Sequence, residues 1–89
     1  MPEMQLEFFD WGIRLQRTHF KRRGDLYEIR YDELAEARLG KTMTRRAICF
    51  LANFLPEPVI FLTVDYREIL DRLERQGVPV NRNAESLAW

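Results

Sequence analysis

The chain contains one histidine and one cysteine, the side chains best suited to act as a base and a nucleophile. His19 lies beside the basic residues 21–23, at the expected exposed end of a strand. Cys49 lies among apolar residues, where a free thiol usually packs as a small hydrophobic group. A single histidine also excludes a histidine-rich metal site. We therefore expect no catalytic residue, no metal site and no cofactor, so the chain is not predicted to be an enzyme.

Residues 35–42 imitate the phosphate-binding loop of nucleotide hydrolases, with alanine in place of its first glycine. That loop requires a buried strand before it and a long helix after it, within a doubly wound sheet. Here the preceding segment is acidic, and 89 residues cannot hold such a sheet. We interpret residues 40–42, Gly-Lys-Thr, as an ordinary turn.

Residues 65–75 carry four carboxylates, but three arginines are interleaved with them at i,i+4 spacing. Such pairs stabilise a solvated helix face by roughly a few tenths of a kcal/mol each. Nothing in this pattern separates two carboxylates into an acid and a base. The segment is interpreted as a solvated helix face with the pairs Arg67–Asp71, Glu68–Arg72 and Asp71–Arg75.

Positive charge is concentrated in the middle of a chain whose formal net charge is zero. Residues 14–46 hold ten of the fourteen Lys and Arg and only five Asp and Glu, whereas the segments on either side are acidic. Near an anionic surface each basic side chain contributes about 1 kcal/mol, so three would raise the affinity about a hundredfold. The anion-binding candidates, all in or beside expected connections, are Lys21, Arg22, Arg23, Lys41, Arg45 and Arg46.

The elements that position these residues begin with three expected strands. Apolar and polar residues alternate over residues 4–8, 13–18 and 27–31, which is typical of half-buried strands. Residues 10–12, Asp-Trp-Gly, predict a turn in which the glycine can adopt a positive φ. Residues 21–25 are interpreted as a charged connection.

The middle of the chain leaves two alternatives at each of two segments. Residues 32–39 fit a short helix capped by Asp32, or one turn followed by a strand over residues 36–39. Residues 44–55 fit either a strand or a helix after a Thr44 cap, and their β-branched and aromatic residues favour the strand. The helix would give an α+β domain with nucleic-acid-binding potential from Arg45 and Arg46.

The last third predicts a strand and a helix. The continuous apolar run over residues 59–64 is typical of a strand buried on both faces. Asp65 with Glu68 forms the pattern of a capping box, and Gly77 followed by Pro79 ends the helix. Residues 80–89 are interpreted as a polar tail that ends on Trp89. The apolar stripe of the expected helix is Tyr66, Ile69, Leu70 and Leu73.

These segments together resemble pleckstrin-homology-like domains, including the bacterial ones. The resemblance rests on residues 8–13, on residues 27–34 with their Ile-x-Tyr-x-x-Leu stretch, and on the closing strand and helix over residues 59–76. It covers residues 4–77 and implies a bent antiparallel sheet or a small, partly open barrel with one C-terminal helix. It also implies a binding or scaffolding role, often with self-association. Because the basic run comes later than the first turn, phosphoinositide recognition is not expected.

We therefore expect a mainly β, α+β domain over residues 1–79, in agreement with a length that suits one domain. The predicted function is a non-enzymatic protein-interaction or self-assembling module that forms homo-oligomers or binds a protein partner. Trp11 and Trp89 are its interface candidates, because tryptophan is enriched at binding hot spots. The alternative is a binder of anionic surfaces, acidic lipid or nucleic acid, through residues 14–46. Weak binding to an anionic membrane is favoured over nucleic acid, and no small-molecule substrate is expected.

The sequence also predicts a cytoplasmic location. Its N-terminus has no basic start followed by an apolar stretch, so it does not fit a secretory signal peptide. The longest strongly apolar run, residues 47–55, is about half a membrane span. Cys49 is then expected to stay reduced.

Overall fold

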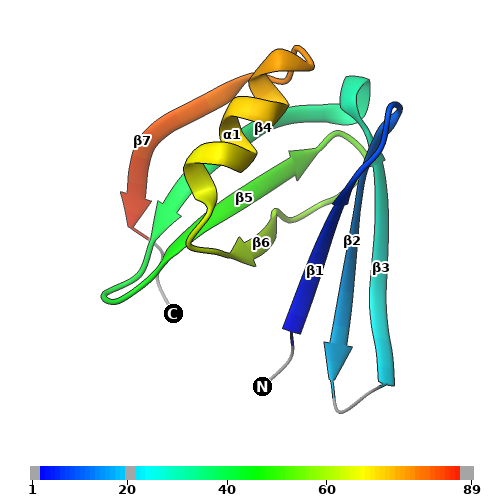
Figure 1. Cartoon of the computed structure of the whole chain (residues 1–89), viewed down its shortest axis with the longest axis horizontal. Helices are drawn as coiled ribbons and strands as arrows, with labels where there is room; N and C mark the ends of the chain where they lie inside the picture. The colour runs from blue at the N-terminus through cyan, green and yellow to red at the C-terminus, as the bar shows by residue number, and fades with distance from the viewer. Residues whose placement is uncertain (1–2, 20–21, 87–89) are drawn as a thin grey trace.

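The computed structural model describes residues 3–19 and 22–86 of the chain. These residues form seven strands, one short 3₁₀ turn and one α-helix, in the order β1–β2–β3–η1–β4–β5–β6–α1–β7. The described strands make a three-stranded sheet, ordered β1-β2-β3, and a four-stranded sheet, ordered β6-β5-β4-β7. Figure 1 shows two separate sheets, with α1 lying across the larger one, rather than a closed barrel. The predicted mainly β, α+β class is confirmed.

The smaller sheet is an antiparallel meander of β1 (Glu3–Phe8), β2 (Gly12–His19) and β3 (Arg22–Arg30). The three predicted strands are confirmed, and the apolar positions of β2 and β3 are fully buried at Ile13, Leu15 and Ile29. The predicted connection over residues 21–25 is wrong for residues 22–25. The backbone pairs His19 with Arg22 and Thr18 with Arg23, so this hairpin continues into the segment expected to be a loop.

A sharp corner joins the two sheets at η1 (Tyr31–Glu33), which leads directly into β4 (Leu34–Lys41). Of the two alternatives for residues 32–39, the turn followed by a strand is confirmed. The Tyr31 hydroxyl donates a 2.6 Å hydrogen bond to the Phe9 carbonyl and so fixes this corner against the β1–β2 turn. Burial raises the pKa of Tyr31, with Arg72 opposing and Asp10 adding to the shift.

The hairpin after β4 differs from the predicted turn at residues 40–42. Gly40 pairs with Ala47 and Lys41 with Arg46, so the glycine and lysine lie in the strand and the turn begins at Thr42. β5 (Arg46–Ala52) pairs with strands on both sides, and four consecutive residues from Ala47 are buried. The helical alternative for residues 44–55 is therefore wrong.

The apolar run over residues 59–64 forms only a short strand, β6 (Val59–Leu62). Val59 is buried, but the rest of the strand is half-buried, because β6 is an edge strand of its sheet and not a central one. Thr63 and Val64 leave the sheet, and Val64 is 89% exposed. The prediction of a strand buried on both faces is wrong.

The helix α1 (Tyr66–Arg75) follows the predicted boundaries. Asp65 occupies the N-cap position, but its side chain makes no capping hydrogen bond, so the predicted capping box does not form. Instead, the Asp65 backbone N–H donates a 3.0 Å bond to the Thr63 hydroxyl. Gly77 adopts a φ of 84° at the end of the helix, as its position after the apolar stripe predicts.

The segment expected to be a polar tail forms β7 (Val80–Ser86) up to residue 86. It pairs in parallel with the outer edge of β4, with Ala37 opposite Val80. Backbone pairing at an open edge does not require apolar side chains, so the polar sequence concealed the strand. Arg82 of β7 contacts α1 through ion pairs with Asp71 at 2.7 Å and Glu74 at 3.7 Å. Asp71 was expected to form i,i+4 ion pairs within the helix, and here it pairs with Arg82 of β7.

One continuous core joins both sheets and the helix. Its largest fully buried side chain is Phe50 of β5, which belongs to the same cluster as Ile13 of the smaller sheet and Leu70 of α1. The Arg72 guanidinium carbon lies 4.0 Å from the centroid of the Phe8 ring and adds a cation–π contact between α1 and the smaller sheet. Within the described residues, no helix has the length and apolar character needed to span a membrane.

Candidate functional site

Two connections lie together at one end of the larger sheet and form what we call the basic tip, residues 41–46 and 62–66. The first is the β4–β5 hairpin, which extends from the body of the molecule in Figure 1. Its turn is held by the Arg45 backbone N–H, which donates a 3.0 Å bond to the Thr42 hydroxyl. The second is the β6–α1 connection, joined to the first because the Thr63 N–H donates a 3.1 Å bond to the Arg46 carbonyl.

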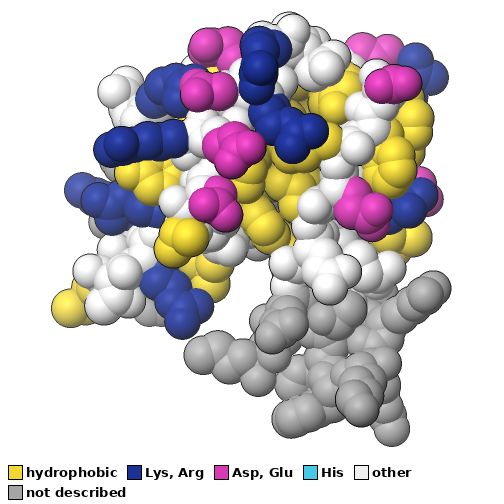
Figure 2. Space-filling view, in the orientation of Figure 1, with side chains coloured by type: hydrophobic (Ala, Val, Ile, Leu, Met, Phe, Trp, Pro, Cys, Tyr) yellow, Lys and Arg dark blue, Asp and Glu magenta, His cyan; other side chains and the backbone are white. Residues whose placement is uncertain are grey.

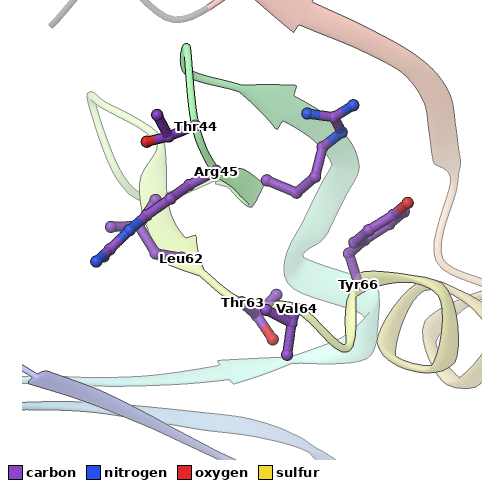
Figure 3. A pocket seen from close by; sticks show the side chains of 7 residues that line it. Thr44, Arg45, Leu62, Thr63, Val64 and Tyr66 are labelled. Atoms are coloured by element: carbon purple, nitrogen blue, oxygen red, sulfur yellow. The ribbon is translucent and has the colours of Figure 1, made fainter.

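A hollow of about 490 Å³ lies between the two connections. Figure 3 shows the labelled side chains arranged around it, with Arg45 and Leu62 on one side and Tyr66 on the other. Its volume falls in the range of small-molecule pockets, although it is open to solvent. The residues that line it are Thr44, Arg45, Arg46, Leu62, Thr63, Val64 and Tyr66.

The cations of the basic tip have no carboxylate partners among the residues that the structure describes. Lys41, Arg45 and Arg46 are exposed and form no ion pair there, in contrast to Arg14 and Arg82. Figure 2 shows Lys and Arg side chains gathered along the side of the molecule where β7 and the β4–β5 hairpin lie. Asp65 also lies in the basic tip, but no ion pair joins it to these three cations, so the basic tip keeps a net positive charge that is open to an external anion.

Exposed apolar side chains lie beside these cations. Met43 at the apex of the hairpin is fully exposed, and Val64 in the second connection is 89% exposed. Sequence reasoning missed both. It placed Tyr66 correctly in the apolar stripe of the helix, where the side chain packs half-buried against the core, but did not show that Tyr66 also lines the hollow. A methionine within the polar turn Thr-Met-Thr-Arg-Arg was the available signal, since turn residues are usually polar.

The structure brings together only three of the six predicted anion-binding residues: Lys41, Arg45 and Arg46. Arg22 and Arg23 lie at the start of β3 in the smaller sheet, away from the basic tip in Figure 1. Lys21 and the interface candidate Trp89 lie outside the described residues. The predicted rim formed by all six cations is therefore not a single surface.

The other interface candidate, Trp11, is part of a second surface that we call the aromatic platform, Phe9, Trp11 and Arg14. The Trp11 ring stacks on Phe9 with 5.1 Å between centroids and 9° between planes, and it is 41% exposed. The Arg14 guanidinium carbon lies 4.8 Å from the Phe9 centroid. The β1–β2 turn that carries this platform and the β4–β5 hairpin lie at opposite ends of the molecule in Figure 1.

The residues that first suggested catalysis lie apart. Cys49 is buried in β5, whereas His19 belongs to β2 of the other sheet. In the described part of the chain, no three His, Cys, Asp or Glu side chains come close enough to hold a metal ion. The side-chain hydrogen bond from Arg38 lowers the pKa of Glu36, which is half-buried on β4 and forms a structural ion pair with Arg38.

The hollow of the basic tip is thus lined by two arginines, two threonines and apolar side chains, a combination suited to binding an anionic, partly apolar ligand. Comparison of the chain with family models, curated proteins and solved structures gives no match, so its function rests on the geometry described above.

Proposed function

We propose that the chain is a non-enzymatic binding module that attaches to an anionic surface through the basic tip. The observation that carries this proposal is the group Lys41, Arg45 and Arg46, which form no ion pair within the described residues. Arg14 and Arg82, by contrast, each have a carboxylate partner close by. Three adjacent cations without such partners support a role in external binding.

An acidic membrane surface fits the basic tip better than nucleic acid does. Nucleic-acid-binding grooves align several cations with a run of phosphates. Here the cations lie at a hairpin with fully exposed Met43 at its apex, which has no role against a phosphate backbone. Each cation adds about 1 kcal/mol, so a single copy binds weakly and several linked copies would bind much more tightly.

Co-sedimentation with vesicles of phosphatidylglycerol and phosphatidylcholine tests the proposal. Binding should fall steeply between low and physiological salt, because counterions screen the exposed charges. The variant Lys41→Gln/Arg45→Gln/Arg46→Gln should bind about a hundredfold more weakly, since it loses three charge contributions. A second variant, Arg17→Gln/Arg30→Gln/Arg75→Gln, removes the same net charge from exposed sites elsewhere and should retain most of the binding.

Three results would contradict this function. The first is that vesicles sediment without the wild-type protein at low salt. The second is that the two triple variants lose the same amount of binding, which would make net charge the only cause. Duplex DNA that binds more tightly than the vesicles, and competes with them, would assign the basic tip to nucleic acid instead.

A second candidate function is binding of a protein partner or of another copy, and the aromatic platform favours it. Trp11 is exposed but already held by its stack on Phe9, so little side-chain entropy would be lost when a partner covers it. Among the described strands, β1, β3, β6 and β7 each have one side without a paired strand, and such edges favour strand addition. We therefore keep homo-oligomer formation as a proposal.

Sedimentation analysis over a wide concentration range tests this second function. The wild-type mass should rise with concentration, and Trp11→Ala should weaken self-association about tenfold or more, as expected for a hot-spot tryptophan. Leu26→Ala is the control, since Leu26 is similarly exposed on β3 but has no stacked neighbour. A wild-type protein that stays monomeric at every concentration would overturn self-association.

The relationship to pleckstrin-homology-like domains and the cytoplasmic location also remain proposals. Two sheets with one packed helix are compatible with that relationship. Binding through the connections between strands, as proposed for the basic tip, is also compatible with it. The parallel pairing of β7 with β4 is a feature that the resemblance does not imply.

A further inference from the structure

Two arginines of the basic tip, Arg45 and Arg46, and the exposed Val64 line the same hollow, and Met43 is the exposed residue next to Thr44 in the hairpin that forms one wall. From this arrangement we infer that the hollow holds the phosphate group of an anionic phospholipid while Met43 and Val64 enter the apolar part of the bilayer. This inference rests on the proposed binding to anionic surfaces and adds both the ligand class and the depth of binding.

Donors for a phosphate are present on both connections of the basic tip. Arg45 and Arg46 line the hollow, and guanidinium groups match the geometry of phosphate oxygens. Thr44 and Thr63 also belong to the residues that line it. The Thr63 oxygen accepts the N–H of Asp65, which leaves its own O–H to donate. The hollow, about 490 Å³, has room for a phosphate with its glycerol group.

The apolar residues indicate a lipid within a bilayer and not a soluble phosphate. Leu62 and Val64 line the same hollow as the arginines, and Met43 stands at the apex of the hairpin beside it. A free phosphate would leave Met43 and Val64 in water, at 102% and 89% exposure. A lipid that offers its phosphate to the arginines places its acyl chains next to these side chains, so charge and apolar surface are matched together.

Fluorescence of Met43→Trp tests the depth of binding. On vesicles of equal parts phosphatidylglycerol and phosphatidylcholine, emission from the introduced tryptophan should shift to the blue and be quenched by lipids brominated on their acyl chains. Wild-type protein, which contains only Trp11 and Trp89, gives the background. Trp11 belongs to the β1–β2 turn, which lies at the opposite end of the molecule from the β4–β5 hairpin in Figure 1, and it should remain unquenched.

The outcomes separate this inference from the proposed function. If Met43→Trp binds the vesicles in a salt-dependent way without a shift or quenching, insertion is overturned and surface binding stands. If neither the Met43→Trp variant nor the wild type binds the vesicles, both the insertion and the proposed function are overturned. If soluble glycerol phosphate releases the protein from vesicles at concentrations near the lipid phosphate, the hollow binds free phosphate, and the assignment to a bilayer lipid is overturned.

Polar substitutions give a second readout that does not depend on the introduced probe. Met43→Ser and Val64→Ser should each weaken vesicle binding about tenfold, because the burial of one such side chain corresponds to about one decade in affinity. The salt dependence should stay as in the wild type, since no charge changes. Leu26→Ser, at an exposed apolar residue of the smaller sheet, should bind like the wild type. Equal binding by all three variants would overturn insertion.

Discussion

Gly12→Ala is expected to destabilise the folded chain by about 3 kcal/mol or more, because the strands leave no space for a side chain at this position. A Cβ atom on Gly12 would lie 2.1 Å from the Ile29 carbonyl oxygen and 2.7 Å from the Arg30 Cα atom. Both neighbours are backbone atoms of β3, so they cannot turn away as a flexible side chain would. Relief requires β2 and β3 to separate where the pair Gly12–Arg30 closes the smaller sheet.

Urea unfolding followed by circular dichroism measures this loss. Gly77→Ala is the matched control, since a Cβ there meets nothing within 4 Å but the φ of 84° disfavours it. That variant should cost about 1 kcal/mol, the price of the left-handed backbone alone. If Gly12→Ala loses no more stability than Gly77→Ala, the close approach of β2 and β3 does not constrain the fold as described.

Gly12 also shows how a correct prediction can rest on an incomplete physical reason. The sequence predicted a turn at residues 10–12, and the Phe9 N–H does donate a 2.8 Å bond to the Gly12 carbonyl across it. The expected cause was a positive φ, yet among the described glycines that conformation belongs to Gly77. The requirement at Gly12 comes from a strand eighteen positions further along the chain, in the register pair Gly12–Arg30, and a local pattern contains no such information.

The elements that the sequence predicted well are those whose burial alternates with the period of their own backbone. Alternation over residues 4–8 and 13–18 predicted β1 and β2, and the stripe of Ile69, Leu70 and Leu73 predicted the buried face of α1. β7 was not predicted, because its polar residues pair through the backbone with β4. The strand predicted over residues 59–64 was too long, because apolar residues alone do not distinguish a central strand from an edge strand.

The candidate site could be predicted in part from the sequence. Lys41, Arg45 and Arg46 flank one turn, so their proximity follows from a hairpin once residues 46–52 are taken as a strand. The second wall of the hollow comes from the β6–α1 connection, about twenty residues later in the sequence. Its position depends on β6 pairing with β5 and ending at Leu62, and the apolar character of residues 59–64 concealed that boundary.

Phe50→Ala is expected to cost about 3–5 kcal/mol, the usual loss for a buried aromatic ring replaced by alanine. Phe50 is fully buried, with a relative exposure of 0%, and it is the largest of the fully buried side chains. A domain of this length has a total stability of roughly 4–13 kcal/mol, so the variant should be close to unfolding at room temperature. Thermal and urea unfolding measure the loss.

Two further variants test whether the stability lost in Phe50→Ala comes from the cavity that the missing ring leaves. Phe50→Leu keeps most of the buried volume and should cost about 1.5 kcal/mol. Phe54→Ala removes the same ring from a side chain that is 53% exposed and should stay within about 1 kcal/mol of the wild type. A loss at Phe54 as large as that at Phe50 would contradict the placement of the core.

Phe50 and Arg46 lie on the same strand, β5, but in different surroundings. Phe50 contributes to the core with α1 and the smaller sheet, whereas Arg46 begins the strand at the exposed basic tip. Phe50→Leu should therefore lower stability without weakening vesicle binding. Arg46→Gln should weaken vesicle binding without lowering stability. Since the hairpin turn is held by its own Thr42–Arg45 bonds, the basic tip keeps its shape as long as β4 and β5 stay paired. Loss of binding by a still-folded Phe50→Leu variant would mean that the core and the basic tip are coupled through β5.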